Sequence, residues 1–167
     1  MSGRTVEPLT SEHDATAFDS GKPELDTWIK RFALASQQAG SARVYVLLDG
    51  GRVVGFYALA AASVELAEAP PRFSKGVARP PIPVILLARL AVDRSQQGMG
   101  LGAALLKDAL LRAVSASGEI GARAVLVHAK DEEARQFYEH FDFEPSPTDP
   151  LHLLLLMKDI RALLRGR

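Results

Sequence analysis

The strongest constraint on the fold lies at residues 94–106, RSQQGMGLGAALL, where three glycines occupy alternate positions and helix-forming residues follow at once. The run before them, residues 82–92, is apolar and rich in β-branched and leucine side chains, which predicts a strand. A helix is expected over 102–116, because Leu105, Leu106 and Leu110 recur at helical spacing. The glycines therefore mark a junction between a strand and a helix.

The segments around this junction predict a mixed sheet. Residues 122–129, ARAVLVHA, are apolar almost throughout, as in a strand buried on both faces. A strand, a helix and a second strand in this order form a right-handed parallel unit. Upstream, two β-rich runs flank Asp49, Gly50 and Gly51, which predicts an antiparallel hairpin. "VEPL" at 6–9 and HLLLLMK at 152–158 are expected to be a first and a last strand.

The remaining segments are assigned to helices and one long loop. A helix is expected over residues 20–40, with Pro23 in its first turn and Gly40 at its end. Its apolar residues at i, i+3, i+4 and i+7 predict one buried face, made by Leu25, Trp28, Ile29 and Phe32. A short helix is expected over 131–141, and a helical or frayed tail over 159–167. Residues 68–83 hold five of the ten prolines and predict an extended loop.

Composition limits the classes of function. A chain of 167 residues predicts a single domain over 1–167. Twenty basic residues balance twenty acidic ones, so any contact with nucleic acid must be local. The absence of cysteine excludes disulfides and thiolate metal sites, and no metal is expected. No apolar run has the length of a signal peptide or a membrane span, which predicts a cytoplasmic protein without membrane contact.

The glycine turn has the chemistry of an anion cradle. Glycines accept positive φ and let several N–H groups converge on one concavity, and the following helix adds unpaired donors and its dipole. A pyrophosphate fits such a cradle. The spacing Gln97-x-x-Gly100-x-Gly102 is neither that of a nucleotide-triphosphate loop nor that of a dinucleotide fingerprint. A tight strand–helix turn without a ligand is the alternative.

Two motifs resemble one enzyme superfamily. LAVDRSQQGMGLGAALL resembles the acetyl-coenzyme A signature of the GNAT N-acetyltransferases, and EEARQFYEHFDFEP resembles their next motif. This resemblance implies an α/β fold of the GNAT type. Such a fold has a mixed, mostly antiparallel sheet with a central parallel strand–helix–strand unit and flanking helices.

One branch of the superfamily is closer still. FDSGKPELDTWIK, VVGFYALAAASVE and the run from His128 to Ile160 resemble the GNAT toxins of bacterial toxin–antitoxin modules. That resemblance covers residues 5–160. It implies acetyl transfer from acetyl-CoA to the α-amino group of aminoacyl-tRNA, a ribbon–helix–helix antitoxin as partner, and a homodimer. The alternatives are a GNAT enzyme acting on a small amine or a protein N-terminus, and an inactive coenzyme A-binding module.

The resemblance also implies site residues. Tyr138 stands at the family's acid position and would protonate the departing thiolate. Backbone groups of one strand end would bind the pantetheine arm, and the glycine turn would bind the pyrophosphate. These residues are Leu90, Ala91 and Val92 for the strand, and Gln97, Gly98, Met99, Gly100, Leu101, Gly102 and Ala103 for the turn. Two positions depart from the family pattern: Asp131 replaces an Asn that touches the cofactor, and Asp142 replaces a turn glycine.

The acceptor side carries basic residues rather than a base. Where many relatives place a Glu on the fourth strand, this chain has Arg89, and no acidic residue lies between Glu68 and Asp93. An α-amine titrates near 7.7–8.0, against about 10.4 for lysine, so aminoacyl-tRNA needs little help to lose its proton. A base elsewhere, or a water chain, is the alternative.

Local charge agrees with an RNA acceptor. Residues 72–112 hold seven basic and two acidic side chains. Candidates for tRNA contact are Arg89, Arg79, Lys30 and Arg31, against the alternative of an ordinary solvated face. Trp28 is expected to be a packing residue, and His128 a core histidine.

Overall fold

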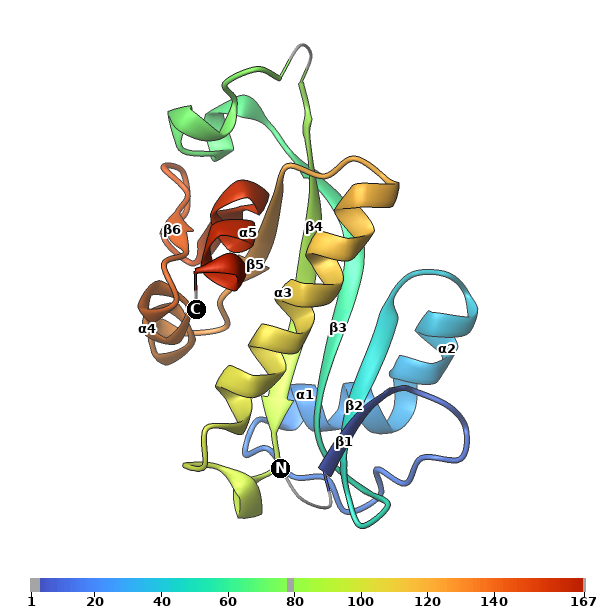
Figure 1. Ribbon diagram of the computed structural model, residues 1–167. Coiled ribbons are helices and arrows are strands. Elements are labelled where there is room, and N and C mark those ends of the chain that lie inside the picture. Colours follow the sequence, from blue (N-terminus) through green and yellow to red (C-terminus); the bar gives the residue numbers. More distant parts are fainter. Residues whose placement is uncertain (1–3, 78–79, 167) are drawn as a thin grey trace. The chain divides into compact units, whose positions relative to one another are not determined.

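The computed structural model describes residues 4–77 and 80–166, and the chain divides into two compact units (Figure 1). The first unit comprises residues 1–60 and 88–109, and the second comprises 61–87 and 110–167. Strand β3 (Arg52–Val64) and strand β4 (Ile82–Val92) each have residues in both units. The seven strands follow the order β1-β2-β3-β4-β5-β7-β6. The predicted mixed, mostly antiparallel sheet is confirmed.

The first unit is built on an antiparallel meander. Strand β1 (Arg4–Pro8) pairs with β2 (Arg43–Asp49), which pairs with β3 (Arg52–Val64). The turn between β2 and β3 uses two glycines at positive φ, 60° for Gly50 and 85° for Gly51. Such a turn matches the twist of the flanking strands. The predicted hairpin and the predicted first strand are therefore confirmed.

The expected helix over residues 20–40 is present, but it is not uniform. It consists of α1 (Pro23–Thr27), a π-helical turn (Trp28–Phe32) and α2 (Ala33–Gln38). Pro23 lies in the first turn, as expected, and Gly40 follows the helix at φ 79°. The π-helical turn was not predicted, because an i+5 hydrogen bond leaves no mark in the apolar spacing.

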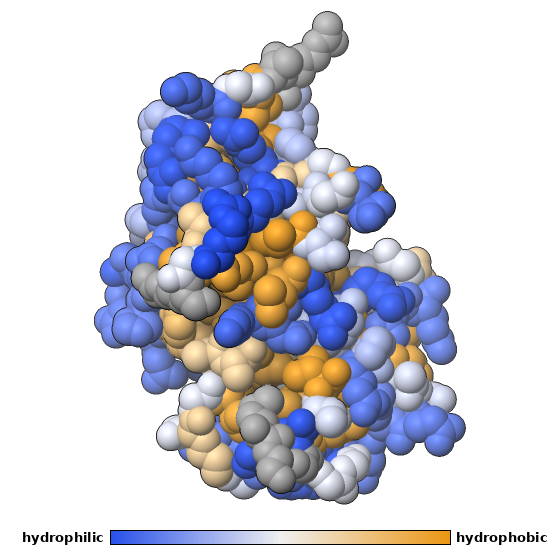
Figure 2. All heavy atoms as spheres, viewed as in Figure 1, coloured by the Kyte–Doolittle hydropathy of each residue, from blue (hydrophilic) through white to orange (hydrophobic). Residues whose placement is uncertain are grey.

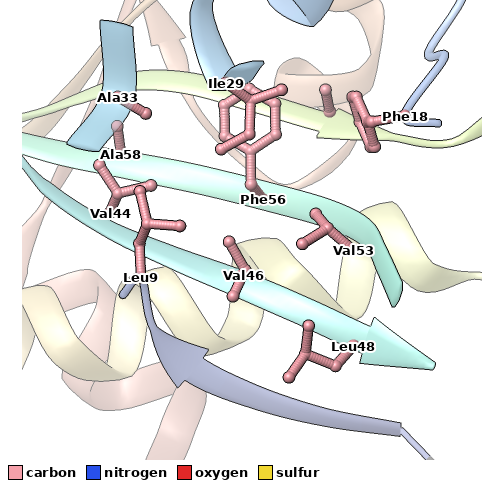
Figure 3. Close-up of a cluster of buried hydrophobic side chains, with 11 residues drawn as sticks. Leu9, Phe18, Ile29, Ala33, Val44, Val46, Leu48, Val53, Phe56 and Ala58 are labelled. Atoms are coloured by element: carbon pink, nitrogen blue, oxygen red, sulfur yellow. The ribbon is translucent and has the colours of Figure 1, made fainter. Parts of the chain in front are cut away.

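The π-helical turn changes which side chains are buried. Ile29 and Ala33 both belong to one core cluster, in which Figure 3 shows Ile29 next to Phe56 and Ala33 next to Ala58. Phe32 is 53% exposed, so the prediction that it shares the buried face is wrong. The core cluster also takes in strand residues of β2, β3 and β4. Its members are Leu9, Phe18, Ile29, Ala33, Val44, Val46, Leu48, Val53, Phe56, Ala58 and Ala91.

The second unit contains the parallel pair. Strand β4 (Ile82–Val92) runs parallel to β5 (Ala124–His128), in register from Val84↔Ala124 to Leu87↔Val127. Helix α3 (Leu101–Glu119) connects β4 with β5, so the predicted strand–helix–strand unit is confirmed. Strand β7 (His152–Leu156) lies antiparallel to β5, and the short β6 (Glu144–Pro145) pairs with β7.

The other segments of the second unit depart from expectation in detail. Helix α4 (Glu132–His140) lies where a helix was predicted, and the tail forms a regular helix, α5 (Met157–Arg165). The proline-rich loop is not simply extended, because 3-10 turns form at Leu66–Glu68 and Pro71–Phe73. Phe73 is fully buried in the second core cluster. Among the helices of the described residues, none is both long and apolar enough to cross a membrane.

A close approach at Gly55 predicts a strong effect on stability. A Cβ on Gly55 would lie 2.9 Å from Leu105 Cδ1 and 3.3 Å from the Ala91 carbonyl oxygen. Gly55→Ala should therefore lower the free energy of unfolding by about 1–3 kcal/mol, measured by chemical denaturation. Gly118→Ala is the matched control, because nothing lies within 4 Å of the added carbon, and it should cause no loss. Equal stabilities of the two variants would contradict this packing.

Candidate active site

A buried carboxylate anchors the segment after β4. The side chain of Asp93 accepts hydrogen bonds from the Asp19 N–H (2.8 Å), the Ser95 N–H (3.0 Å) and the Ser95 hydroxyl (2.6 Å). Burial opposes the charge, but the hydrogen bonds from Ser95 and Asp19 outweigh it and lower the pKa of Asp93. The chain between the strand and the glycines is thereby fixed as a 3-10 turn, Arg94–Gln96.

Gln97 holds the start of the glycine turn. Its side-chain Nε2 donates to the Ser20 carbonyl (3.0 Å) and to the Val92 carbonyl (2.8 Å). The side-chain amide nitrogen is thus engaged with the protein backbone, so this nitrogen supports the turn. A glutamine at this position is explained by its amide donors, which reach two carbonyls at once.

The glycines have the conformation that the cradle requires. Gly98 and Gly100 have φ of 80° and 79°, and no atom of the described residues lies within 4 Å of a Cβ built on either. Gly102 lies in the first turn of α3, where backbone N–H groups have no partner within the helix. The turn therefore presents open space, bare backbone and a helix N-terminus, and an anion such as a pyrophosphate fits it.

The strand end before the turn completes this half of the site. The parallel pairing of β4 with β5 covers Val84–Leu87 and, within the described residues, does not extend to Leu90–Val92. Ala91 is buried in the core, while Leu90 and Val92 are half-buried. A strand segment without a neighbour on one side can pair with an extended ligand through its backbone.

One acceptor candidate of the first unit, Arg89, lies over an aromatic stack. The Arg89 guanidinium carbon lies 4.3 Å from the centroid of the Trp28 ring, and that ring stacks on Phe56 at 5.9 Å and 19°. Burial lowers the pKa of Arg89. Trp28 is therefore a packing residue, as expected, but it also supports a cation. Lys30 and Arg31 are exposed on the π-helical turn, and Arg79 lies outside the described residues.

Tyr138 lies in the second unit, on α4. It is buried, with edge-to-face contacts to Phe137 (5.1 Å) and Phe143 (5.4 Å). Burial raises the pKa of Tyr138 well above its ordinary value, so the phenol keeps its proton at neutral pH. Within the described part of the chain, no residue forms a hydrogen bond with its hydroxyl. The phenol thus has the protonation state that a proton donor needs.

The two departures from the family pattern have structural roles. Asp131 caps α4, and its side chain accepts a hydrogen bond from the Ala134 N–H at 2.9 Å. A short acidic side chain at this position stabilises a helix start. Asp142 replaces a turn glycine and adopts φ 69°, a left-handed conformation that Asp tolerates better than most residues.

One histidine was misassigned. His128 is exposed, so the prediction of a core histidine is wrong. Its ring stacks on His152 at 4.0 Å, and His152 lies 3.4 Å from Asp149. Partial burial and the charge of the nearby His152 lower the pKa of His128. The two histidines meet because His128 on β5 pairs in register with His152 on β7. Such a register cannot be predicted from the sequence near either histidine.

Part of the basic surplus is already paired. Arg72 forms ion pairs with Glu144 and with Asp159 (2.8 Å). These three side chains line a cavity of about 400 Å³ together with Asp142 and Leu155. Arg94 likewise lies 3.2 Å from Asp19. The local surplus of positive charge is therefore smaller in the folded protein than a count of residues indicates.

Comparison with known proteins identifies the class. Residues 40–145 match the acetyltransferase (GNAT) domain family, and the chain belongs to this family. The family assignment made from the two sequence motifs is thereby confirmed.

The branch is confirmed in the same way. The chain is 56% identical to the tRNA-acetylating toxin of Mycobacterium tuberculosis (strain ATCC 25618 / H37Rv) over 165 residues, which cover 98% of this chain and 99% of the relative. It is similar to the structure of AtaT complexed with acetyl-methionyl-tRNAfMet (TM-score 0.90, 30% identity, 96% and 99% of the two chains). It is also similar to a tyrosine-to-phenylalanine mutant of AtaT bound to the C-terminus of the antitoxin AtaR and acetyl-CoA (TM-score 0.85, 29% identity, 97% and 98%).

The environment of Tyr138 predicts its titration. A pKa raised by burial keeps the folded phenol neutral while the unfolded phenol ionises near pH 10, so stability is lost as pH rises past that value. Ultraviolet titration of the folded protein should therefore show the same number of ionising phenols in wild type and Tyr138→Phe. An additional phenol titrating near pH 10 in the wild type alone would contradict the burial.

Proposed function

We propose that this protein is an N-acetyltransferase that moves the acetyl group of acetyl-CoA to the α-amino group of aminoacyl-tRNA. It thereby acts as the translation-blocking toxin of a toxin–antitoxin module. The observation that carries the proposal is the 56% identity, over nearly the whole of both chains, to a tRNA-acetylating toxin. The conformation of the glycine turn and of the strand end supports it, and so does the protonation state of Tyr138.

The cofactor half of the site uses backbone groups. The N–H groups from Gln97 to Ala103 surround the open space over Gly98 and Gly100 and would bind the pyrophosphate of acetyl-CoA. Leu90, Ala91 and Val92 would pair with the pantetheine arm as a further strand does. The side chains of Asp93 and Gln97 hold this backbone in place.

The transfer step needs three groups. The neutral amine attacks the thioester carbonyl carbon, and the new C–N bond gives a tetrahedral intermediate, which collapses as the C–S bond breaks. A backbone N–H of the strand end stabilises the oxyanion of the tetrahedral intermediate. Tyr138 donates its phenolic proton to the departing thiolate, the amine releases one proton to solvent, and the phenolate of Tyr138 takes up one proton from solvent, which restores the phenol. Because an α-amine titrates near 7.7–8.0, much of it is neutral at physiological pH, and no carboxylate base is needed.

The acceptor half is basic. Arg89 lies on β4 and has no ion-pair partner among residues 4–77 and 80–166. Its planar guanidinium can donate two hydrogen bonds to one phosphate. Lys30 and Arg31 add exposed positive charge in the same unit, and Arg79 is a further candidate. These residues would position the acceptor end of the tRNA.

The partners follow from the same proposal. The complex of AtaT with the antitoxin AtaR supports an antitoxin as partner, and we propose one of the ribbon–helix–helix type. A homodimer acting in the cytoplasm, where charged tRNA is found, completes the proposal.

The test is direct acetylation of charged tRNA. Purified protein is incubated with acetyl-CoA and a pool of charged tRNA, and the aminoacyl groups are released and analysed by mass spectrometry. Acetyl groups on the α-amines are the expected result. Acetylation of free amines or peptide N-termini, with charged tRNA untouched, would support the small-amine or N-terminal enzyme instead. Thiol release with none of these acceptors modified would also contradict the proposal.

Gly100→Asp should weaken acetyl-CoA binding at least tenfold, about 1.4 kcal/mol or more by calorimetry. The substitution puts a carboxylate into the cradle and strains a residue at φ 79°. Gly40→Asp is the matched control, because Gly40 has the same φ and equally open surroundings but lies at the end of α2. Equal affinities of the two variants for acetyl-CoA would remove the pyrophosphate from this turn.

Tyr138→Phe should slow single-turnover transfer to charged tRNA by about 10²-fold, the low end for general acids, because a thiolate is a good leaving group. Acetyl-CoA affinity should persist, since only one hydroxyl is lost. Tyr45→Phe removes a hydroxyl from β2 and should leave the rate unchanged. A Tyr138→Phe rate within about threefold of wild type, under ~1 kcal/mol of barrier, would assign Tyr138 to packing alone.

A further inference from the structure

The π-helical turn Trp28–Phe32 rotates one aromatic side chain out of the core. In a regular α-helix, Trp28, Ile29 and Phe32 would share one face. Here the Ala33 N–H donates to the Trp28 carbonyl five residues earlier. As a result Ala33 is fully buried and Phe32 is 53% exposed. Turns of this kind are rare and occur often at functional sites, so the exposure of Phe32 calls for a functional explanation.

Phe32 stands apart from the other exposed apolar residues. Figure 2 shows hydrophobic residues on the viewed face as patches among hydrophilic ones. Among the described residues, the large hydrophobic side chains that are exposed are Phe32, Leu66, Met99, Leu111 and Ile120. Phe32 is the aromatic member of this group. About half of this residue is still exposed, and this apolar surface remains for a ligand to cover.

The charges around Phe32 select an anionic ligand. Lys30 and Arg31 precede it in the same turn, and both are exposed. Neither forms an ion pair with a residue in the described ranges. From Asp26 to Asp49 the intervening chain holds three basic residues and no acidic residue. An exposed aromatic ring beside basic side chains is typical of surfaces that bind single-stranded nucleic acid.

A second planar group, the Arg89 guanidinium, lies over Trp28, the first residue of the π-helical turn. The Arg89 guanidinium covers the Trp28 ring at 4.3 Å, and Trp28 is held by its stack on Phe56. Trp28 and Phe32 lie four residues apart on one helical segment, which places their side chains on adjacent turns. The first unit therefore exposes an aromatic ring on the π-helical turn, and it holds a guanidinium over Trp28, which begins the same turn.

We propose that Phe32 stacks on a base in the unpaired 3′ end of the charged tRNA, while Arg89, positioned by Trp28, contacts a neighbouring phosphate. The inference rests on the proposed function and deepens it by assigning the acceptor contact. Unpaired RNA is recognised by bases that stack on aromatic side chains, with basic groups along the backbone. The aminoacyl end of tRNA is unpaired, so its bases are free to stack.

The experiment compares two acceptors in wild type, Phe32→Ala and Phe32→Trp. One acceptor is charged tRNA, and the other is an amino acid methyl ester, which has the amine and the ester but no base. With tRNA, Phe32→Ala should raise KM about tenfold with kcat nearly unchanged, whereas Phe32→Trp should retain the wild-type KM. With the methyl ester, the three proteins should agree within twofold. Ile120→Ala, which truncates a 77% exposed apolar residue, is the control and should match wild type throughout.

Salt dependence separates the base contact from the phosphate contact. Arg89→Gln should make the slope of log(kcat/KM) against log salt shallower by about 0.7, the value for one phosphate on a single strand. Phe32→Ala should leave that slope unchanged, because stacking releases no counterions.

Three results would overturn the inference. The first is a wild-type KM for tRNA in Phe32→Ala. The second is an equal defect on the methyl ester. The third is a change in oligomer mass in Phe32→Ala without a change in KM, which would make Phe32 a protein–protein contact. Each of these leaves tRNA acetylation by the wild type intact. Failure of the proposed function is distinct, because the wild type itself would then not acetylate charged tRNA.

Discussion

The buried carboxylate of Asp93 is the interaction on which the candidate site depends. It receives N–H groups from both Asp19 and Ser95, and so it joins the segment before α1 to the segment after β4. Gln97 adds a second link between the same two segments, through the Ser20 and Val92 carbonyls. These side chains fix the path of the backbone, and the glycines that follow can remain without side chains of their own. The side chains that support the cradle therefore lie outside it.

The sequence predicted the parts of the fold that depend on local signals. The glycine turn, the hairpin at Gly50 and Gly51 and the parallel strand–helix–strand unit were all predicted, because each has a short pattern with one structural solution. The positive φ of Gly98 and Gly100 was expected for the same reason. Tyr138 was proposed as the proton donor through the family motif, because its burial, and the raised pKa that follows from burial, are not visible in the sequence.

The features that were missed depend on register or on a local irregularity. The stack of His128 on His152 exists because β5 and β7 pair in one particular register, which distant residues determine. Arg72 was counted as free positive charge, but Glu144 and Asp159 come from elements more than 70 residues away. Phe32 was assigned to the core because a 3.6-residue period was assumed, and one extra residue in the turn is enough to rotate it outward.

The two halves of the first unit's site follow opposite chemical rules, and the difference fits the ligands. In the proposed function, acetyl-CoA is the same molecule in every turnover, so backbone N–H groups would suffice to bind it, with the side chains of Asp93 and Gln97 as supports. The acceptor must be distinguished from other amines, and side chains would do this: a cation held over Trp28 and an aromatic ring exposed by a π-helical turn. Arg89, which replaces an acidic residue, is explained by the chemistry of this acceptor. An acceptor amine that titrates near neutrality needs no base, so this strand position can carry a charge that attracts the RNA instead of one that takes a proton.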